Sequence, residues 1–243
     1  MARSRAIKLK SALGDELRLR HMQGEEALGE PFRYELLLLS ESEQHAFEDL
    51  LGTGMTVCMS LSDESERYFH GLVSEFVYLG TEGEFARYRA VLRPWVWFLN
   101  RTQDCRIFQE MNAIEIVKEI FGKYGIAEFE DRLSGSFESR DYCVQYRESD
   151  LNFVNRLLET EGATYFFEHV DGKHTLILTD GDHQPVAGFG KCRSFPKPPR
   201  AGESETTYTN GTRAQSSNRA LTSTPLMTSP SPRWVWRRSS ISR

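Results

Sequence analysis

The sequence predicts a mainly β protein of the α+β class, in which a small antiparallel β-barrel precedes an α+β domain with two helices. Short β-rich runs joined by polar turns predict the barrel. Two later segments, near 112–124 and 150–161, carry apolar residues at helical spacing. Beyond them the apolar residues follow neither strand nor helix spacing, which predicts a disordered tail. We therefore divide the chain into a barrel at 1–99, an α+β domain at 100–182, and a linker and tail at 183–243.

The barrel is expected to contain five strands, separated by polar or glycine-containing turns, at 17–21, 32–39, 55–61, 67–79 and 85–92. Four consecutive leucines, Leu36 to Leu39, predict burial of both faces at the end of the second strand. Unpaired strand edges invite a strand from a neighbouring chain. We therefore expect the interaction surfaces at the outer edges of the barrel, with 32–39 and 68–79 as candidate segments.

Arginines occupy one face of the fifth strand. Arg87, Arg89 and Arg93 point one way, opposite to the apolar residues between them. This pattern is typical of a solvated outer face. It also fits a face that lines a channel or meets an acidic partner, and the sequence leaves both interpretations open.

Capping residues define the two helices of the second domain. Asn112 and Glu115 form a variant of the capping box at the start of the first helix. Ser149 is expected to cap the second helix, and Gly162 to end it in the left-handed conformation. Asp171 and Gly172 stand between two β-rich runs and predict a tight hairpin.

Composition excludes several classes of function. The net charge of −5 argues against nucleic acid as a partner, because phosphate binding requires a basic surface. No apolar run approaches the roughly 20 residues that span a bilayer. The basic start has no apolar segment after it, so we expect no signal peptide. The four widely spaced cysteines predict buried thiols in a reducing cytosol, in preference to disulfides or a zinc site.

Several side chains are of types that can carry chemistry, but the sequence predicts no catalytic, cofactor-binding or metal site among them. Acidic groups and histidines that could hold a metal are explained better by turn and hairpin structure. Carboxylates that could form an acid–base pair fit a solvated helix face. Aromatic residues that could stack on a base or sugar fit a buried domain junction, because no basic cluster interleaves with them. The metal candidates are Asp180, Asp182, His183, His169 and His174; the carboxylates are Glu148, Asp150, Glu159 and Glu161; the aromatic residues are Trp95, Trp97 and Phe98.

Three motifs in a fixed order carry a family resemblance. They read RYFHGLVSEFVYLG, YRAVLRPWVWFLNRTQDCRIFQEMNAIEIVKEIF and YRESDLNFVNRLLETEGATYFFEH, and together they cover roughly residues 5–190. This region resembles the N-terminal, hub-like part of the VgrG family, the spike proteins of type VI secretion systems.

The resemblance implies a structural role without enzymatic activity. VgrG-like hubs are homotrimers that adapt the Hcp tube to a spike needle and are translocated with effector proteins. The resemblance therefore implies a chain that waits in the bacterial cytoplasm and leaves through the secretion apparatus. A carbohydrate or peptidoglycan hydrolase is the alternative from another class, and an effector-binding adaptor that uses 95–97 is a third.

The tail departs from the family pattern. After Glu205 no acidic residue occurs, whereas arginine, serine, threonine and proline are frequent. We interpret this segment either as the product of a frameshift or truncation, or as a genuinely divergent tail. In the first case we expect a hub fragment that cannot complete a spike.

Overall fold

The computed structural model describes residues 7–61 and 65–181. The predicted tail at 183–243 lies outside these ranges. Strands predominate in the described part, together with two α-helices and three short 3-10 helices, so the prediction of a mainly β, α+β protein is confirmed. No helix within these ranges is long and apolar enough to cross a membrane.

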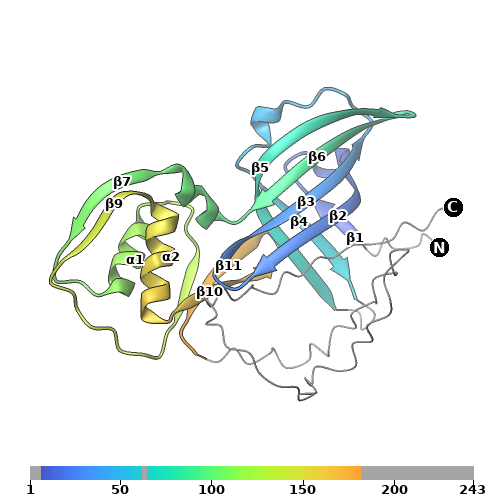
Figure 1. The fold of residues 1–243 in the computed structure, drawn as a ribbon. Helices are drawn as coiled ribbons and strands as arrows, with labels where there is room; N and C mark the ends of the chain where they lie inside the picture. Colours follow the sequence, from blue (N-terminus) through green and yellow to red (C-terminus); the bar gives the residue numbers. More distant parts are fainter. Residues whose placement is uncertain (1–6, 62–64, 182–243) are drawn as a thin grey trace, which may run out of the picture. The chain divides into compact units, whose positions relative to one another are not determined.

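Six antiparallel strands form a curled sheet around a hydrophobic core (Figure 1). Their order across the sheet is β1-β4-β5-β6-β3-β2. Their bounds are β1 Ile7–Lys10, β2 Arg18–Ala27, β3 Glu30–Ser40, β4 Gly54–Ser60, β5 Glu66–Glu82 and β6 Phe85–Arg93. The expected five strands correspond to β2–β6. The strand β1 was missed, because Ile7 and Leu9 alternate with lysines over only four residues.

Burial alternates along β3. Leu36 and Leu38 are fully buried beside Tyr34 and Tyr88, whereas Leu37 and Leu39 are only half-buried. The prediction that both faces are buried here is therefore wrong, because successive side chains of a strand point to opposite faces and only one face reaches this core. Burial of a leucine side chain contributes about 1.5–3 kcal/mol, so β3 is one of the main contributors to the core.

The second half of the described chain packs around a separate hydrophobic cluster. It begins with a 3-10 helix, η3, and contains two α-helices and five strands. The bounds are η3 Trp95–Arg101, β7 Gln103–Phe108, α1 Ala113–Gly122, β8 Phe129–Arg132, β9 Cys143–Ser149, α2 Asp150–Glu161, β10 Thr164–Val170 and β11 Lys173–Thr179. The strands β7 and β9 form an antiparallel ribbon, and β8 runs parallel to β11 beside the β10–β11 hairpin.

The helix caps agree with the sequence. The Asn112 side chain accepts from the backbone N–H of Glu115, and the Glu115 carboxylate accepts from the backbone N–H of Asn112, so the capping box is confirmed. The Ser149 hydroxyl accepts from the backbone N–H of Asn152, and Gly162 ends α2 with a φ of 70°. These bonds satisfy amides that would otherwise lack partners at the helix ends.

One aromatic side chain lies against both hydrophobic clusters. Phe167 of β10 packs against the core of the curled sheet and also against the core around α1 and α2. Residues 7–181 belong to one compact unit. The division at residue 99 into a barrel and an α+β domain remains a prediction.

Candidate interaction surfaces

The outermost strands of the curled sheet are β1 and β2, and of the two expected segments only 68–79 has sides without a strand partner in this sheet. Segment 32–39 lies in β3, which pairs with β2 on one side and β6 on the other, so that prediction is wrong. Segment 68–79 lies in β5, which pairs with β4 only from Glu66 to Leu72 and with β6 only from Leu72 to Glu82. The first half of β5 thus has β4 as its strand partner, and the second half has β6. Strand order depends on contacts between distant segments, which the alternation of residues does not reveal.

Arg87 and Arg89 of β6 are paired with glutamates across the outer face of the sheet, whereas Arg93 lies over the ring of Trp97. Arg87 lies 3.7 Å from Glu82, and Arg89 lies 3.7 Å from Glu75. A third arginine, Arg20 of β2, contacts Glu82 at 3.0 Å. These pairs favour the interpretation as a solvated outer face, because both signs of charge alternate along it.

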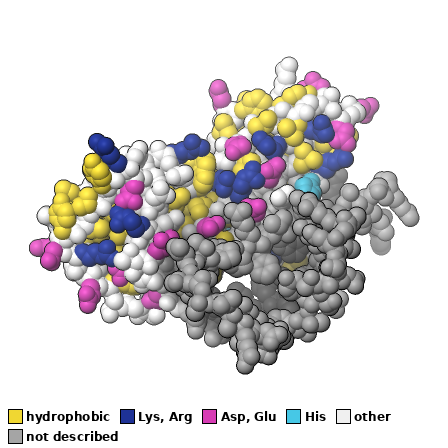
Figure 2. Space-filling view, in the orientation of Figure 1, with side chains coloured by type: hydrophobic (Ala, Val, Ile, Leu, Met, Phe, Trp, Pro, Cys, Tyr) yellow, Lys and Arg dark blue, Asp and Glu magenta, His cyan; other side chains and the backbone are white. Residues whose placement is uncertain are grey.

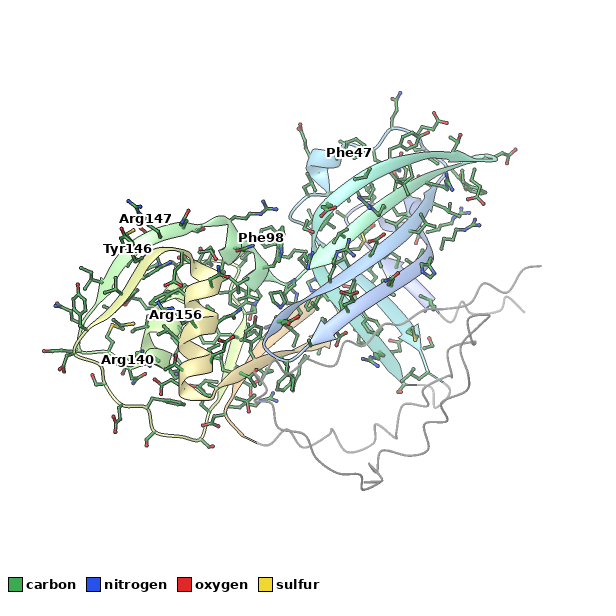
Figure 3. All side chains as sticks on the ribbon, in the orientation of Figure 1. Phe47, Phe98, Arg140, Tyr146, Arg147 and Arg156 are labelled. Carbon is green, nitrogen blue, oxygen red and sulfur yellow. The ribbon has the colours of Figure 1, made fainter. Side chains whose placement is uncertain are left out.

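The tryptophan cluster is divided between the core and the surface. Trp95 is 1% exposed, and its Nε1–H donates to the backbone oxygen of Glu128 at 3.0 Å. Trp97 is half-buried and contacts the guanidinium groups of Arg93 and Arg101 at 5.4 and 4.7 Å from the ring centre. Phe98, labelled in Figure 3, contacts Trp97 edge to face. Trp95 therefore belongs to the core, which agrees with the prediction of buried aromatic residues. It cannot serve as a stacking platform for a base or sugar.

The four candidate carboxylates do not form an acid–base pair. Asp150 is 1% exposed and accepts from Tyr124, Arg106 and Gln145 at 2.8, 3.1 and 2.8 Å. Glu148 is paired with Arg156 at 2.5 Å. Among the remaining two, Glu161 is paired with Arg140 at 2.5 Å and Glu159 is exposed on α2. Each buried or half-buried carboxylate thus stabilises the fold through a basic partner, which gives the hydrolase interpretation no support.

Asp180 serves the local turn structure. Its carboxylate accepts from the backbone N–H groups of Ser134 and Gly135 and from the Ser134 hydroxyl. These hydrogen bonds lower the pKa of Asp180. The other two members of this candidate metal site, Asp182 and His183, lie outside the described residues.

Two histidines of the β10–β11 hairpin meet a third from the curled sheet. His169 and His174 are paired in register, as the sequence predicted. His70 of β5 lies with its Nδ1 at 2.8 Å from His174 Nδ1, and its backbone N–H donates to His169 Nδ1 at 3.2 Å. No local pattern pointed to His70, which is 99 positions from His169. Within residues 7–61 and 65–181, no group of three or more His, Cys, Asp or Glu is arranged to hold a metal ion.

The ribbon of β7 and β9 exposes apolar side chains. Ile107 is 60% exposed and Tyr146, labelled on β9 in Figure 3, is 65% exposed. Tyr142 is exposed beside them, and Figure 2 shows hydrophobic side chains on this part of the surface. Cys105 lies on the same ribbon and is exposed, so the prediction of a buried thiol is wrong at this position; Cys58 and Cys143 are buried. Cys192 lies outside the described residues.

Comparison with known families defines the class of this fold. The family model of the phage tail baseplate hub (GPD) matches residues 25–226, which include the strands β3–β6 of the curled sheet and the whole α+β segment. The chain therefore belongs to the phage tail baseplate hub family.

Particular relatives within this class are spike proteins of type VI secretion. The chain is 43% identical over 196 residues to the type VI secretion system spike protein VgrG1b of Pseudomonas aeruginosa, covering 79% of this chain and 26% of that protein. It is 42% identical over 199 residues to VgrG1a of the same species, covering 81% of this chain and 31% of that protein. The resemblance to VgrG proteins is thus confirmed, and the chain spans about a quarter to a third of the length of these relatives.

A solved structure supports the same conclusion. An Escherichia coli component of the type VI secretion system, described as structurally similar to the T4 bacteriophage tail proteins gp27 and gp5, matches with a TM-score of 0.64 and 27% identity. The match covers 71% of this chain and 49% of that chain.

Proposed function

We propose that this chain is a structural hub component of a type VI secretion spike and acts by shape and assembly, without making or breaking bonds. The observation that carries the proposal is the 43% identity to a spike protein over 196 residues. Structural contacts of Asp150, Glu148, His70 and His174 support it, because these side chains are engaged in holding the fold.

The proposed partners are further copies of the chain and the Hcp tube protein. As an adaptor, the chain forms a homotrimer, seats on the tube, and connects it to the spike needle. Among the described residues, β2 is the longer of the two outermost strands of the sheet, with ten residues against four in β1. Unpaired N–H and C=O groups on such an edge can pair with a strand from another chain.

The proposed route follows from this role. The chain resides in the bacterial cytoplasm before firing and leaves through the secretion apparatus together with effector proteins. This part of the proposal rests on the relatives, which are spike proteins.

Binding of the chain to immobilised Hcp-type tube protein is a direct test of the proposal. The full chain is passed over the tube protein, and its mass is measured separately by light scattering. We expect retention on the tube protein and a mass of three copies of the 28.0 kDa chain. Retention of a monomer would contradict self-assembly, and free passage through the column would contradict the adaptor role.

A matched pair of substitutions tests the role of β2. Gln23 lies opposite Glu35 of β3, so Gln23→Lys places a positive charge on the edge strand opposite a carboxylate. Asn152→Lys introduces the same side chain at an exposed position of α2. We expect Gln23→Lys to weaken assembly at least tenfold and Asn152→Lys to leave it unchanged. Equal assembly of both variants would remove β2 from the interface.

A further inference from the structure

Three histidines and one tyrosine form a continuous hydrogen-bonded network beneath the β10–β11 hairpin. His174 accepts from the backbone N–H of Trp95 at 3.0 Å, and its Nδ1 lies 2.8 Å from Nδ1 of His70. The backbone N–H of His70 donates to Nδ1 of His169 at 3.2 Å. His169 continues through its Nε2 to the Tyr34 hydroxyl at 3.1 Å. The network joins four segments of the chain: β3, β5, the start of η3, and the hairpin.

The geometry fixes the proton positions in the first branch of this network. A ring nitrogen that accepts an N–H cannot carry a proton itself, so neutral His174 carries its proton on Nδ1. This proton is donated to Nδ1 of His70, which must then be the unprotonated nitrogen. His70 therefore carries its own proton on Nε2, a position packed so closely that a Cβ at Gly54 would lie 2.7 Å from it.

The second branch is fixed in the same way. Nδ1 of His169 accepts from the backbone of His70, so the proton of neutral His169 lies on Nε2. Nε2 then donates to the Tyr34 oxygen, and the Tyr34 hydroxyl donates to Glu26 at 2.5 Å. In each of these four hydrogen bonds a donor meets an acceptor only while the three imidazoles are neutral.

Protonation of any of these rings disrupts the network. A second proton on His174 would face the N–H of Trp95, and one on His70 would face the N–H of His174. A proton on Nδ1 of His169 would face the backbone N–H of His70. Two donors cannot share a hydrogen bond, so each imidazolium replaces an attractive contact with a repulsive one.

The charged neighbours do not compensate for a buried imidazolium. His70 and His174 are buried, and Phe32 contacts both hairpin histidines. Four charged groups lie near the imidazole rings or next to a residue that contacts them: Asp171, Lys10, Arg67 and Glu26. Asp171 favours a charge on His70 but is already paired with Lys10, Arg67 disfavours a charge on His169, and Glu26 reaches the network only through Tyr34.

We propose that this network is an acid-sensitive latch, which holds the β10–β11 hairpin against β3, β5 and η3 at neutral pH and releases it as the pH falls below about 6, where histidine normally takes up a proton. The latch goes beyond the role of spike component and does not depend on it. It concerns a contact within one chain and requires no partner.

The pKa shifts have the sign that the latch requires. Burial lowers the pKa of His169 to about 4 and that of His174 to about 3, and it also lowers the pKa of His70. The released histidines have an ordinary pKa of about 6.5. The latch is therefore fully stable above about pH 6.5 and weakens as the pH falls toward about 4, by up to tenfold per pH unit for each histidine.

The proton positions can be measured on the full chain in its native state. Imidazole 15N shifts at pH 7.5 should show His174 protonated on Nδ1, and His70 and His169 protonated on Nε2. A His174 with its proton on Nε2 would overturn the latch, because Trp95 would then have no acceptor.

Hydrogen exchange tests the release itself. After correction for intrinsic rates, we expect the amides of Trp95, His70 and the β10–β11 hairpin to lose protection between pH 6.5 and 4.5, before the amides of β6. Loss of protection at one pH throughout the chain would overturn the proposal.

A non-titrating variant supplies the matched control. Asparagine can keep an acceptor near Nδ1, so His70→Asn preserves the bond from His174 but cannot be protonated. We expect its acid dependence to be shallower by up to tenfold per pH unit, whereas His21→Asn, on β2 outside the network, should follow the parent chain. His169→Asn provides a second test if His70→Asn fails to fold. An unchanged acid dependence in a folded network variant would overturn the latch.

Discussion

The described chain contains two buried polar networks that differ in charge and in how far apart their members lie in the sequence. The network around Asp150 is ionic and joins residues of β7, β9 and α2 with Tyr124, which follows α1, within 44 positions. The network around His70 is neutral and joins segments up to 135 positions apart. An ionic network retains its contacts over a wide pH range, whereas a neutral histidine network loses them in acid. The two halves of the fold are thus expected to respond differently to the same change of solvent.

The largest effect is expected from removal of the carboxylate at Asp150. Asp150→Ala leaves the guanidinium of Arg106, which is 16% exposed, without its buried partner. Breaking a buried pair in this way costs about 3–5 kcal/mol of the free energy of unfolding, which urea denaturation measures at pH 7.

Asp104→Ala is the matched control, because Asp104 also pairs with Arg106 but has a side chain 47% exposed. Its effect on unfolding should be much smaller. Equal losses from the two substitutions would show that burial does not set the strength of this network.

A smaller effect is expected from crowding the histidine network. Gly54→Ala places a methyl group 2.7 Å from Nε2 of His70 and forces the ring to move. Overpacking of this kind costs about 1–3 kcal/mol. Thermal unfolding at pH 7.5 should record the loss, and the acid dependence should become shallower because the network is already disturbed.

Gly122→Ala is the matched control for this crowding. Gly122 ends α1, and a Cβ there would meet no atom within 4 Å apart from its chain neighbours and the backbone of its own helix. This substitution should leave stability unchanged or increase it slightly, because alanine loses less chain entropy on folding. A loss at Gly122 as large as that at Gly54 would rule out contact with His70 as the cause.

The smallest of these effects is expected from a helix cap. Ser149→Ala removes the hydroxyl that accepts from Asn152 and should lower the free energy of unfolding by about 1 kcal/mol. Urea denaturation measures this change, and Ser139→Ala, in an exposed loop, should have no effect. Stability of Ser149→Ala equal to that of the parent chain would show that α2 depends on packing alone.

The features that the sequence predicted correctly are local ones. Asn112 and Ser149 act within three residues of their own positions, so the helix starts could be recognised without knowledge of the rest of the chain. The Asp171–Gly172 turn likewise fixes the register of its two strands.

The features that the sequence did not reveal depend on contacts between distant segments. The edge position of β2 follows from the order of six strands, and His70 joins the hairpin only after that order is formed. The strand β1 is too short to show a period, and it is placed by pairing with β4. The exposure of Cys105 depends on which face of the β7–β9 ribbon covers the helices.

Phe167 has a consequence for the way in which the molecule unfolds. Its ring is shared by two otherwise distinct hydrophobic clusters, so loosening either one uncovers surface that also belongs to the other. Because both clusters share this apolar contact, local unfolding of one favours local unfolding of the other. Phe167 therefore links the hydrophobic core of the curled sheet to that of the helix pair, beside the hydrogen bonds of the histidine network.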